Sequence, residues 1–338
     1  RYVGTNDSRC YLSELEFYGY EGVGDDSQFY QITNLPTVSI HTYNGKNPQS
    51  KGQDFESNVC IIYDEGTLIQ EYPVLTRVRG NASASFPKKP YRIKFNDGKS
   101  HRIMKDGKLE SPAKAKKWTL INNYGDKSLM RNHIALGIAR KFSEEMPDGI
   151  PWNVRGQFVE VVYNGVHIGN YYLCEQIKVD KNRVPDGYVL EIDYRAKETN
   201  GDIFFTSDLT NLNFVLKDPE PEKGSDEYNY AQKYINNIEK LLKDGDVEGY
   251  RSYLNMESFV DWYLNQEFSM NMDACFFLSV YMNIGEDGKL YMGPLWDFDI
   301  AFGNDVFPEG EDNHTPEGFY IYNADRSKLW MKVLRNDE

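Results

Sequence analysis

Two aspartates in the segment WDFDIAFGN, residues 296–304, are the residues of this chain best suited to chemistry. Asp297 and Asp299 follow an apolar, aromatic run that predicts a strand, and Gly303 and Asn304 then turn the chain. Side chains alternate along a strand, so two carboxylates at i and i+2 point to the same side. That arrangement suits a hard divalent cation bound through oxygen. An acidic β-turn fits the same residues, so the rest of the chain has to decide.

A third aspartate, Asp273, lies at the end of the predicted helix 256–274. A predicted hairpin, formed by residues 275–283 and 289–299, separates it from Asp297. Because a hairpin returns its ends to proximity, we expect the two carboxylates to meet. In phosphoryl transfer, one aspartate orients or deprotonates the acceptor hydroxyl and another holds magnesium against the phosphates. Asp273 also fits a plain turn residue at the end of a helix.

Cations gather in the first, β-rich part of the chain. In the strand YRIKF, Lys94 alternates with an arginine, so both cations face one side of that strand. The turn-rich loop RGNASASFPKKP, residues 79–90, precedes the strand, and it could contact phosphates through backbone N–H groups and Arg79. Lys88 and Lys89 in this loop compete with Lys94 for the same role. All of these cations also fit a solvated basic surface.

The segment YYLCEQIK predicts an apolar strand that ends at Glu175 and Ile177. Backbone groups at such a strand end could form a hinge to which an adenine ring is hydrogen-bonded. Glu175 fits a surface position equally well. His133 falls within a predicted helix and is interpreted as structural, and none of the five histidines has a visible metal-ligand partner.

Charge and composition exclude several classes of protein. The net charge of −14 argues against binding to nucleic acid or to an anionic membrane, since both need a basic surface. An anionic ligand such as ATP must therefore be received by a local basic patch or by metal ions. No run of about 18 apolar residues is present, so we expect no membrane span. The four cysteines are too scattered for a zinc site, and their spacing leaves disulfide pairing open: Cys10, Cys60, Cys174 and Cys275.

Turn signals and composition divide the chain into three parts. Residues 1–22 read as the tail of a preceding β-rich module, and residues 23–34 as a linker rich in Gly and Asp. Residues 35–338 form the main domain. We take both ends of the chain as trimmed, so the absence of a visible signal peptide carries little information.

Within the main domain, strand runs are separated from helix runs, and this order predicts an α+β fold. The helix over 125–142 is expected to begin at Asp126 or Ser128 as N-cap. The Asn164-Gly165 pair predicts a hairpin over 156–178. The remaining strands are expected at 35–43, 58–65, 73–80, 90–99, 116–124, 188–194 and 201–207, and the remaining helices at 225–246 and 256–274.

From about Leu35 to the C-terminus, the chain resembles the CotH family, the spore-coat-protein-H-like atypical protein kinases. The resemblance is carried, in order, by RGNASASFPKKPYRIKF, WTLINNYGDKSLMRNHIA, VVYNGVHIGNYYLCEQIK, NMDA and GPLWDFDIAFGN. It implies a divergent, two-lobed protein-kinase-like fold, with a mixed or antiparallel sheet in the N-lobe and a helix-rich C-lobe that has a closing β-hairpin. The first segment, RYVGTNDSRCYLSELEFYGYEG, resembles the end of a discoidin-type, carbohydrate-binding-like module.

The resemblance implies a secreted or cell-surface enzyme that binds ATP and Mg²⁺ and phosphorylates serine or threonine hydroxyls of a protein substrate. Asp273 matches the catalytic aspartate of the family and Asp297 the metal-binding aspartate. Asp299 is expected to add a second metal ligand. Lys94 is the best candidate for the phosphate-contacting lysine. The full set of expected nucleotide contacts is Arg79, Lys88, Lys94, Glu175 and Ile177.

Two departures leave a second function open. Some family members carry an asparagine five residues after the catalytic aspartate, and here that position is Leu278. The helix over 126–142 also has no glutamate in reach of Lys94 for an ion pair. The alternative is a catalytically degenerate surface protein that acts in attachment, binding a partner or a cell-surface glycan. An AMP-transferring enzyme or a ligase is a third reading.

Overall fold

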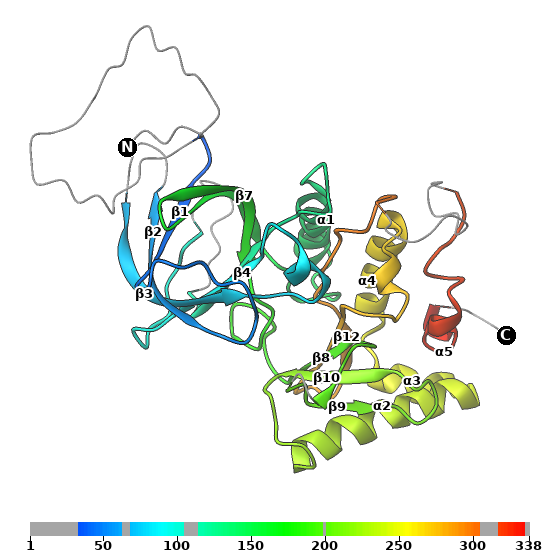
Figure 1. Ribbon diagram of the computed structural model, residues 1–338. Helices are drawn as coiled ribbons and strands as arrows, with labels where there is room; N and C mark the ends of the chain where they lie inside the picture. Colours follow the sequence, from blue (N-terminus) through cyan, green and yellow to red (C-terminus); the bar gives the residue numbers. More distant parts are fainter. Residues whose placement is uncertain (1–32, 63–67, 105–113, 199–200, 305–316, 335–338) are drawn as a thin grey trace, which may run out of the picture.

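The computed structural model describes residues 33–62, 68–104, 114–198, 201–304 and 317–334. The predicted N-terminal module and most of the predicted linker lie outside these ranges. Two sheets and a set of helices make up the described part (Figure 1). Within it, no helix combines the length and apolar character needed to cross a bilayer.

The first sheet closes into a barrel, with the described strands in the order β1-β2-β3-β4-β5-β7-β6. The closure is made by β1, which pairs with β6 in parallel, whereas the other neighbours are antiparallel. Alternate side chains of each strand, such as Tyr91, Ile93 and Phe95, fill the interior. The strands are β1 Thr37–Thr42, β2 Phe55–Ile62, β3 Leu68–Val78, β4 Tyr91–Phe95, β5 Lys117–Ile121, β6 Gly156–Tyr163 and β7 Val166–Glu175.

The second sheet is antiparallel, and its described strands run in the order β12-β11-β8-β10-β9. In Figure 1, α2 and α3 lie along it, while α4 lies between α1 and α5. The strands are β8 Tyr188–Ile192, β9 Phe204–Thr206, β10 Asn213–Asp218, β11 Val280–Ile284 and β12 Leu290–Met292. The helices are α1 Arg131–Glu145, α2 Asp226–Asp244, α3 Val247–Tyr253, α4 Met256–Ser269 and α5 Lys328–Met331.

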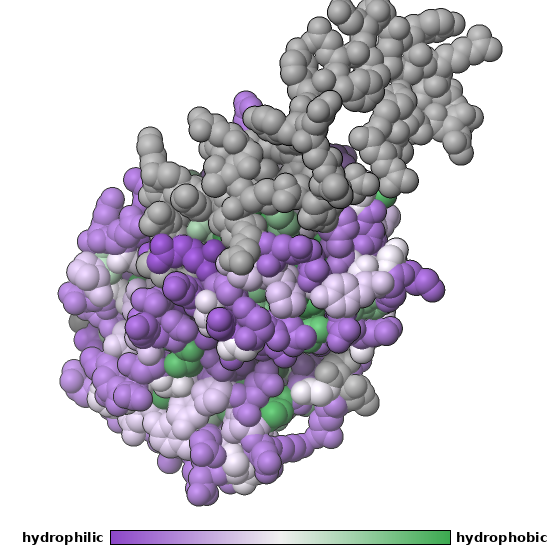
Figure 2. All heavy atoms as spheres, turned by 90° about the vertical axis from the view of Figure 1, so that its left-hand side faces the viewer, coloured by the Kyte–Doolittle hydropathy of each residue, from purple (hydrophilic) through white to green (hydrophobic). Residues whose placement is uncertain are grey.

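The outer face of β7 connects the barrel to the rest of the molecule. Tyr172 and Cys174 point away from the barrel interior and are fully buried in the second hydrophobic core. That core also contains Leu136 and Ala139 of α1 together with side chains of the second sheet. Helix α1 therefore shares one apolar core with the outer face of β7 and with the second sheet. On the barrel side the described surface is mostly hydrophilic, with hydrophobic residues scattered singly (Figure 2).

The predicted two-lobed, protein-kinase-like architecture is wrong for this chain. In place of an N-lobe with a mixed or antiparallel sheet and a helix-rich C-lobe, the structure has a closed barrel, followed by a second sheet and helices. The parallel pairing of Thr37–Ile40 with Glu160–Tyr163 closes the barrel across more than 100 residues. Side-chain alternation identifies a strand and its buried face, but it does not identify the neighbouring strand.

Most individual elements lie close to their predicted positions, and the differences are at the ends. The helix expected from residue 125 begins at Arg131. The helix expected to reach residue 274 ends at Ser269, because Met270 adopts a left-handed conformation with φ 48°. A short 3-10 helix, Met272–Ala274, follows. Strand β10 and helix α3 were not predicted.

Candidate active site

Three aspartates from two segments lie near one another beside the second sheet, with Asp273 buried and Asp297 and Asp299 partly buried. Asp273 lies in the 3-10 helix after α4, and Asp297 and Asp299 lie in the segment that follows β12. Both Asp297 and Asp299 act electrostatically on Asp273, and Asp297 acts on Asp299. The hairpin β11–β12 thus brings together the ends that sequence reasoning expected to meet.

Burial and mutual repulsion make these carboxyls hard to ionise. Burial, and then the charges of Asp297 and Asp299, raise the pKa of Asp273 to about 8, with Arg195 opposing the rise. Burial, followed by the charge of Asp297, raises the pKa of Asp299 to about 7. Burial also raises the pKa of Asp297, although a hydrogen bond from Ser279 opposes it. Like charges that lie close together and are partly removed from water are stabilised in ionised form by a bound cation.

Asp297 is held by contacts on both its side chain and its backbone. The Ser279 hydroxyl donates to Asp297 Oδ2 at 3.0 Å, and Asn271 Nδ2 donates to the carbonyl oxygen of Asp297 at 3.1 Å. Asp297 has φ 66°, in the left-handed region, so the strand end predicted here is not extended. The proximity of the two carboxylates therefore comes from a turn and not from strand alternation.

Asn271 presents an unused acceptor in this region. Its Nδ2 donates to both Gln266 Oε1, at 3.0 Å, and the carbonyl of Asp297, which fixes the orientation of the amide. Its Oδ1 is buried and has no hydrogen-bond partner. A free amide oxygen near carboxyl groups is a donor set that suits a hard cation. The motif NMDA contains this residue, but sequence reasoning assigned no role to it.

Two arginines oppose the negative charge of the aspartates. Arg79, just after β3, places its guanidinium carbon 5.5 Å from the centroid of the Trp296 ring, and its charge opposes the raised pKa of Asp297. Arg195 acts in the same way on Asp273 and donates from Nε to the Tyr194 hydroxyl at 3.0 Å. Arg79 was predicted as a phosphate contact. Arg195 was missed, because its place after β8 becomes informative only once β8 is known to lie beside β11.

The loop lysines are used by the barrel itself. Lys88 donates to the carbonyl of Asn170, and its Nζ lies 4.5 Å from the centroid of the Tyr171 ring. Burial lowers the pKa of Lys88, and the charge of Glu160 opposes that shift. Lys89 donates to the carbonyl of Ala84 at 2.9 Å. Lys88 therefore fastens the predicted phosphate loop to β7 of the barrel, whereas Lys89 makes its contact within the loop.

Lys94 belongs to a second group of cations on the outer face of the barrel. It lies opposite Lys117 of β5, and Arg92 lies opposite Arg77 of β3. Burial, and then the charge of Arg92, lower the pKa of Lys117. Lys94 is four residues along β4 from Pro90, whose carbonyl accepts the N–H of Arg79. At about 3.3 Å per residue, Lys94 lies about 13 Å along the sheet from the position of Pro90 and Arg79.

Glu175 is fully buried, so its interpretation as a surface residue is wrong. Its Oε2 accepts the N–H of Arg155 at 3.1 Å, and Oε1 lies 3.9 Å from Nε of Arg183. Arg183 also donates from Nη1 to the carbonyl of Gln176 at 2.6 Å. The polar groups at this strand end are therefore partly engaged within the protein. Ile177 is buried in the core shared by α1 and the second sheet.

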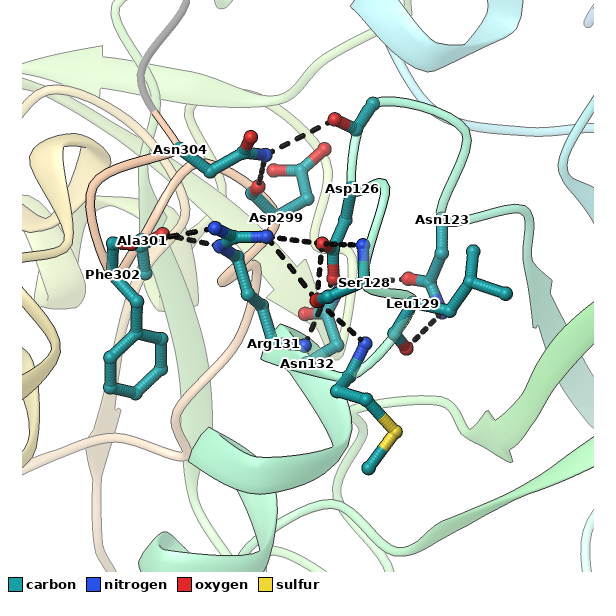
Figure 3. Close-up of polar contacts among 12 residues, drawn as sticks. Asn123, Asp126, Ser128, Leu129, Arg131, Asn132, Asp299, Ala301, Phe302 and Asn304 are labelled. Atoms are coloured by element: carbon teal, nitrogen blue, oxygen red, sulfur yellow. Dashed lines mark hydrogen bonds and ion pairs between the residues drawn. The ribbon is translucent and has the colours of Figure 1, made fainter.

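The start of α1 is joined to the segment that carries Asp299 (Figure 3). Arg131 donates from Nε to the carbonyl of Ala301 at 2.9 Å, and Asn132 Oδ1 accepts the N–H of Phe298 at 2.9 Å. Asn304 Nδ2 donates to the carbonyls of Gly125, at 3.1 Å, and Asp299, at 2.6 Å. We refer to Arg131, Asn132 and Asn304 as the latch. It fixes the backbone on either side of Asp299.

Asp126 anchors the latch from the other side. Its Oδ2 accepts the N–H of Arg131 at 2.9 Å, and its Oδ1 accepts from Ser128 and from the Arg131 guanidinium. The prediction of Asp126 or Ser128 as the N-cap of the helix is wrong, because the N-cap is Met130, which has no side-chain cap. Asp126 nevertheless accepts the N–H of Arg131, the first helical residue.

Among the described residues, no group of three or more His, Cys, Asp or Glu side chains has the arrangement of a metal site. Magnesium in phosphoryl-transfer sites is held by one or two carboxylates, with the remaining ligands supplied by phosphates and water. Asp297 and Asp299 supply that number of carboxylates, and the free acceptor of Asn271 lies beside them.

Comparison with known proteins identifies the family. The CotH family, described as "CotH kinase protein", matches residues 76–338, which is most of the chain. The matched region contains the three aspartates, both arginines and the latch. A search of curated proteins finds no match. The chain belongs to the CotH family.

Proposed function

We propose that this protein transfers the γ-phosphate of ATP to serine or threonine hydroxyls of a protein substrate, with Mg²⁺ as cofactor, outside the cell or at its surface. The observation that supports it best is the proximity of Asp273, Asp297 and Asp299, whose charges act on one another in a partly buried site. Carboxyls that raise each other's pKa are suited to a cation, and phosphoryl transfer needs both a metal-binding and a hydroxyl-orienting aspartate.

Each aspartate has a distinct proposed role. Asp297 and Asp299 would hold Mg²⁺, which supplies neutralisation of charge on the phosphates. Asp273 orients the acceptor hydroxyl and receives its proton at a carboxylate oxygen. Arg195 favours the ionised form of Asp273 that this role requires. The latch keeps Asp299 in place while the site binds its ligands.

Arg79 is the phosphate contact that the geometry favours, because its charge acts on Asp297 and its guanidinium packs on Trp296. Lys94 remains a candidate within the second group of cations, where Lys117 and Arg92 accompany it. Lys88 contributes indirectly, by fastening the loop that follows Arg79. We also propose that the backbone at Glu175 and Ile177 forms the hinge that binds adenine.

The test is incorporation of radiolabelled phosphate from ATP and Mg²⁺ into the protein itself. We expect incorporation by the wild type, and its loss in Asp297→Ala and Asp273→Asn. Asp244→Ala, which alters an exposed residue at the end of α2, is the matched control and is expected to retain activity. Equal incorporation of phosphate by the wild type and by Asp297→Ala would contradict the proposed kinase function.

A thermal-shift measurement separates this function from a purely adhesive one. A ligand that binds the folded state stabilises it, even when the affinity is modest. No stabilisation of the wild type by millimolar ATP and Mg²⁺ would favour the attachment or glycan-binding role. Mass spectrometry of the product distinguishes phosphate from AMP by the added mass.

A further inference from the structure

A cavity of about 520 Å³ lies next to Asp273. One wall comes from the 3-10 helix that carries Asp273 and from the residues just after it. The other wall comes from residues 319–326, which precede α5. A volume of this size fits a large side chain with part of its neighbours. The described lining residues are Met272, Cys275, Phe277, Phe319, Tyr320, Asn323, Ala324, Asp325 and Arg326. We call this cavity the side pocket.

The outer wall of the side pocket is fixed by Glu267 of α4. Its carboxylate accepts the N–H groups of Tyr320, Ile321 (3.2 Å) and Tyr322 (2.9 Å). Asn323 closes the same turn, since its Nδ2 donates to the carbonyl of Phe319 at 2.8 Å. A carboxylate that receives several backbone N–H groups holds a turn in one conformation. The pocket is thus preorganised to receive a ligand.

A stack of aromatic rings and arginines joins the side pocket to Asp273. The Phe277 ring packs on Tyr194 with centroids 3.8 Å apart, and the Arg326 guanidinium carbon lies 4.2 Å from the Phe277 centroid. Arg195 lies 5.1 Å from the centroid of the Tyr194 ring and acts on Asp273. A ligand in the pocket is therefore positioned relative to Asp273 through a rigid column of side chains.

The lining selects an apolar side chain. Phe319 is 62% exposed, so a ligand that covers its ring removes apolar surface from water. Burial, followed by the charges of Glu267 and Asp273, raises the pKa of Cys275 to about 12, so its thiol is neutral. Met272 and Phe277 complete an uncharged floor. Aromatic and large aliphatic groups fit this surface.

The rim selects an acidic group. Asp325 forms an ion pair with Lys328, so its charge is compensated within its own turn. The exposed Arg326 then gives the pocket a positive rim in a molecule whose net charge is −14. A carboxylate on the ligand can pair with Arg326 while Arg326 stays packed on Phe277.

We propose that the side pocket is the docking subsite for the acceptor protein. It takes an aromatic or large apolar side chain close to the phosphorylated residue, with an acidic side chain facing Arg326. This inference rests on the proposed phosphoryl transfer, and it names the class of acceptor segment. Binding of that segment places its hydroxyl group at Asp273.

The direct test is peptide binding without nucleotide, measured by fluorescence anisotropy. Three labelled peptides share a central serine and differ in flanking residues: Phe with Asp, Phe with Lys, and Ala with Asp. We expect the Phe–Asp peptide to bind tightest and Phe319→Ala to weaken it about tenfold. Tyr43→Ala, which removes an aromatic side chain of similar exposure (64%) just after β1, is the matched control and is expected to bind like the wild type.

A charge swap gives a second, independent readout. Arg326→Glu is expected to reverse the preference, so that the Phe–Lys peptide binds better than the Phe–Asp peptide. A gain of binding cannot result from misfolding. Equal binding of all three peptides by the wild type, or an unchanged preference in Arg326→Glu, overturns the inference.

The same peptides separate this inference from the proposed function. Preferential binding of the Phe–Asp peptide with no phosphate transfer to any acceptor refutes the kinase function and leaves the pocket specificity standing. Phosphate transfer to all three peptides with equal KM refutes the docking subsite and leaves the kinase function standing.

Discussion

Arg131 Nε donates to the carbonyl oxygen of Ala301 at 2.9 Å, which joins the first residue of α1 to the segment that carries two of the three aspartates. Arg131 also pairs with the buried Asp126. One side chain therefore couples the helix, the turn before it and the candidate metal site. Substitution of Arg131, a residue of the latch, should therefore change the free energy of unfolding.

Replacing Arg131 with Gln is expected to destabilise the protein by about 3 kcal/mol, because it leaves the carboxylate of Asp126 buried without its ionic partner. Urea unfolding measures this loss. The double variant Asp126→Asn/Arg131→Gln should recover part of it, because the uncompensated charge is removed. Additive losses in the double variant would contradict the coupling.

Asp297→Asn is expected to leave the free energy of unfolding equal to or above that of the wild type. The substitution removes a partly buried charge that raises the pKa of both Asp273 and Asp299, and the Ser279 hydroxyl can donate to the new amide oxygen. Stabilisation by ATP and Mg²⁺ is expected to disappear; in the wild type it is about 1.4 kcal/mol at about tenfold ligand excess over Kd. Calorimetry with and without ligand measures both quantities.

Arg79→Ala is expected to raise the Kd for ATP and Mg²⁺ about tenfold or more, since a hydrogen bond between charged groups contributes about 1.5–3 kcal/mol. Lys94→Ala is the comparison, and a smaller effect is expected because Lys94 is about 13 Å along the sheet from the level of Arg79. Isothermal titration measures both values. A larger effect from Lys94 would return the phosphate contact to the lysine favoured by the family resemblance.

The stability contributed by Asp126 is expected to depend on pH. Burial opposes its ionisation, but hydrogen bonds from Ser128 and Arg131 outweigh burial and lower the pKa of its carboxyl. Because the folded-state pKa lies below the unfolded value of about 3.9, this contribution is present above that value and lost as the pH falls through the folded-state pKa. The difference in unfolding free energy between wild type and Asp126→Asn should therefore shrink in acid. If the difference in unfolding free energy stays constant down to about pH 2, the predicted contribution of the Asp126 carboxylate is wrong.

The sequence was informative wherever local patterns decide structure. Alternation predicted strands such as YRIKF, and the Asn164-Gly165 turn predicted the pair β6–β7, because a two-residue turn fixes its hairpin locally. The meeting of Asp273 with Asp297 was predictable for the same reason, since a hairpin of adjacent strands lies between them. Family motifs supplied the proposed roles of these residues.

Contacts between distant segments could not be read from such patterns. The parallel pairing of β1 with β6, which closes the barrel, and the approach of Arg79 to Asp297 each join residues far apart in the sequence. The same holds for Arg195 beside Asp273 and for the hydrogen bond from Arg131 to Ala301.

The sequence alone therefore indicated which residues are candidates for the chemistry and which short elements present them, because side-chain period and turn preference are properties of neighbouring residues. Only the tertiary structure decided which strand closes the barrel, which arginines act on the aspartates and which residues hold the segment of Asp299 in place. Those choices depend on burial and packing between segments that no local pattern records.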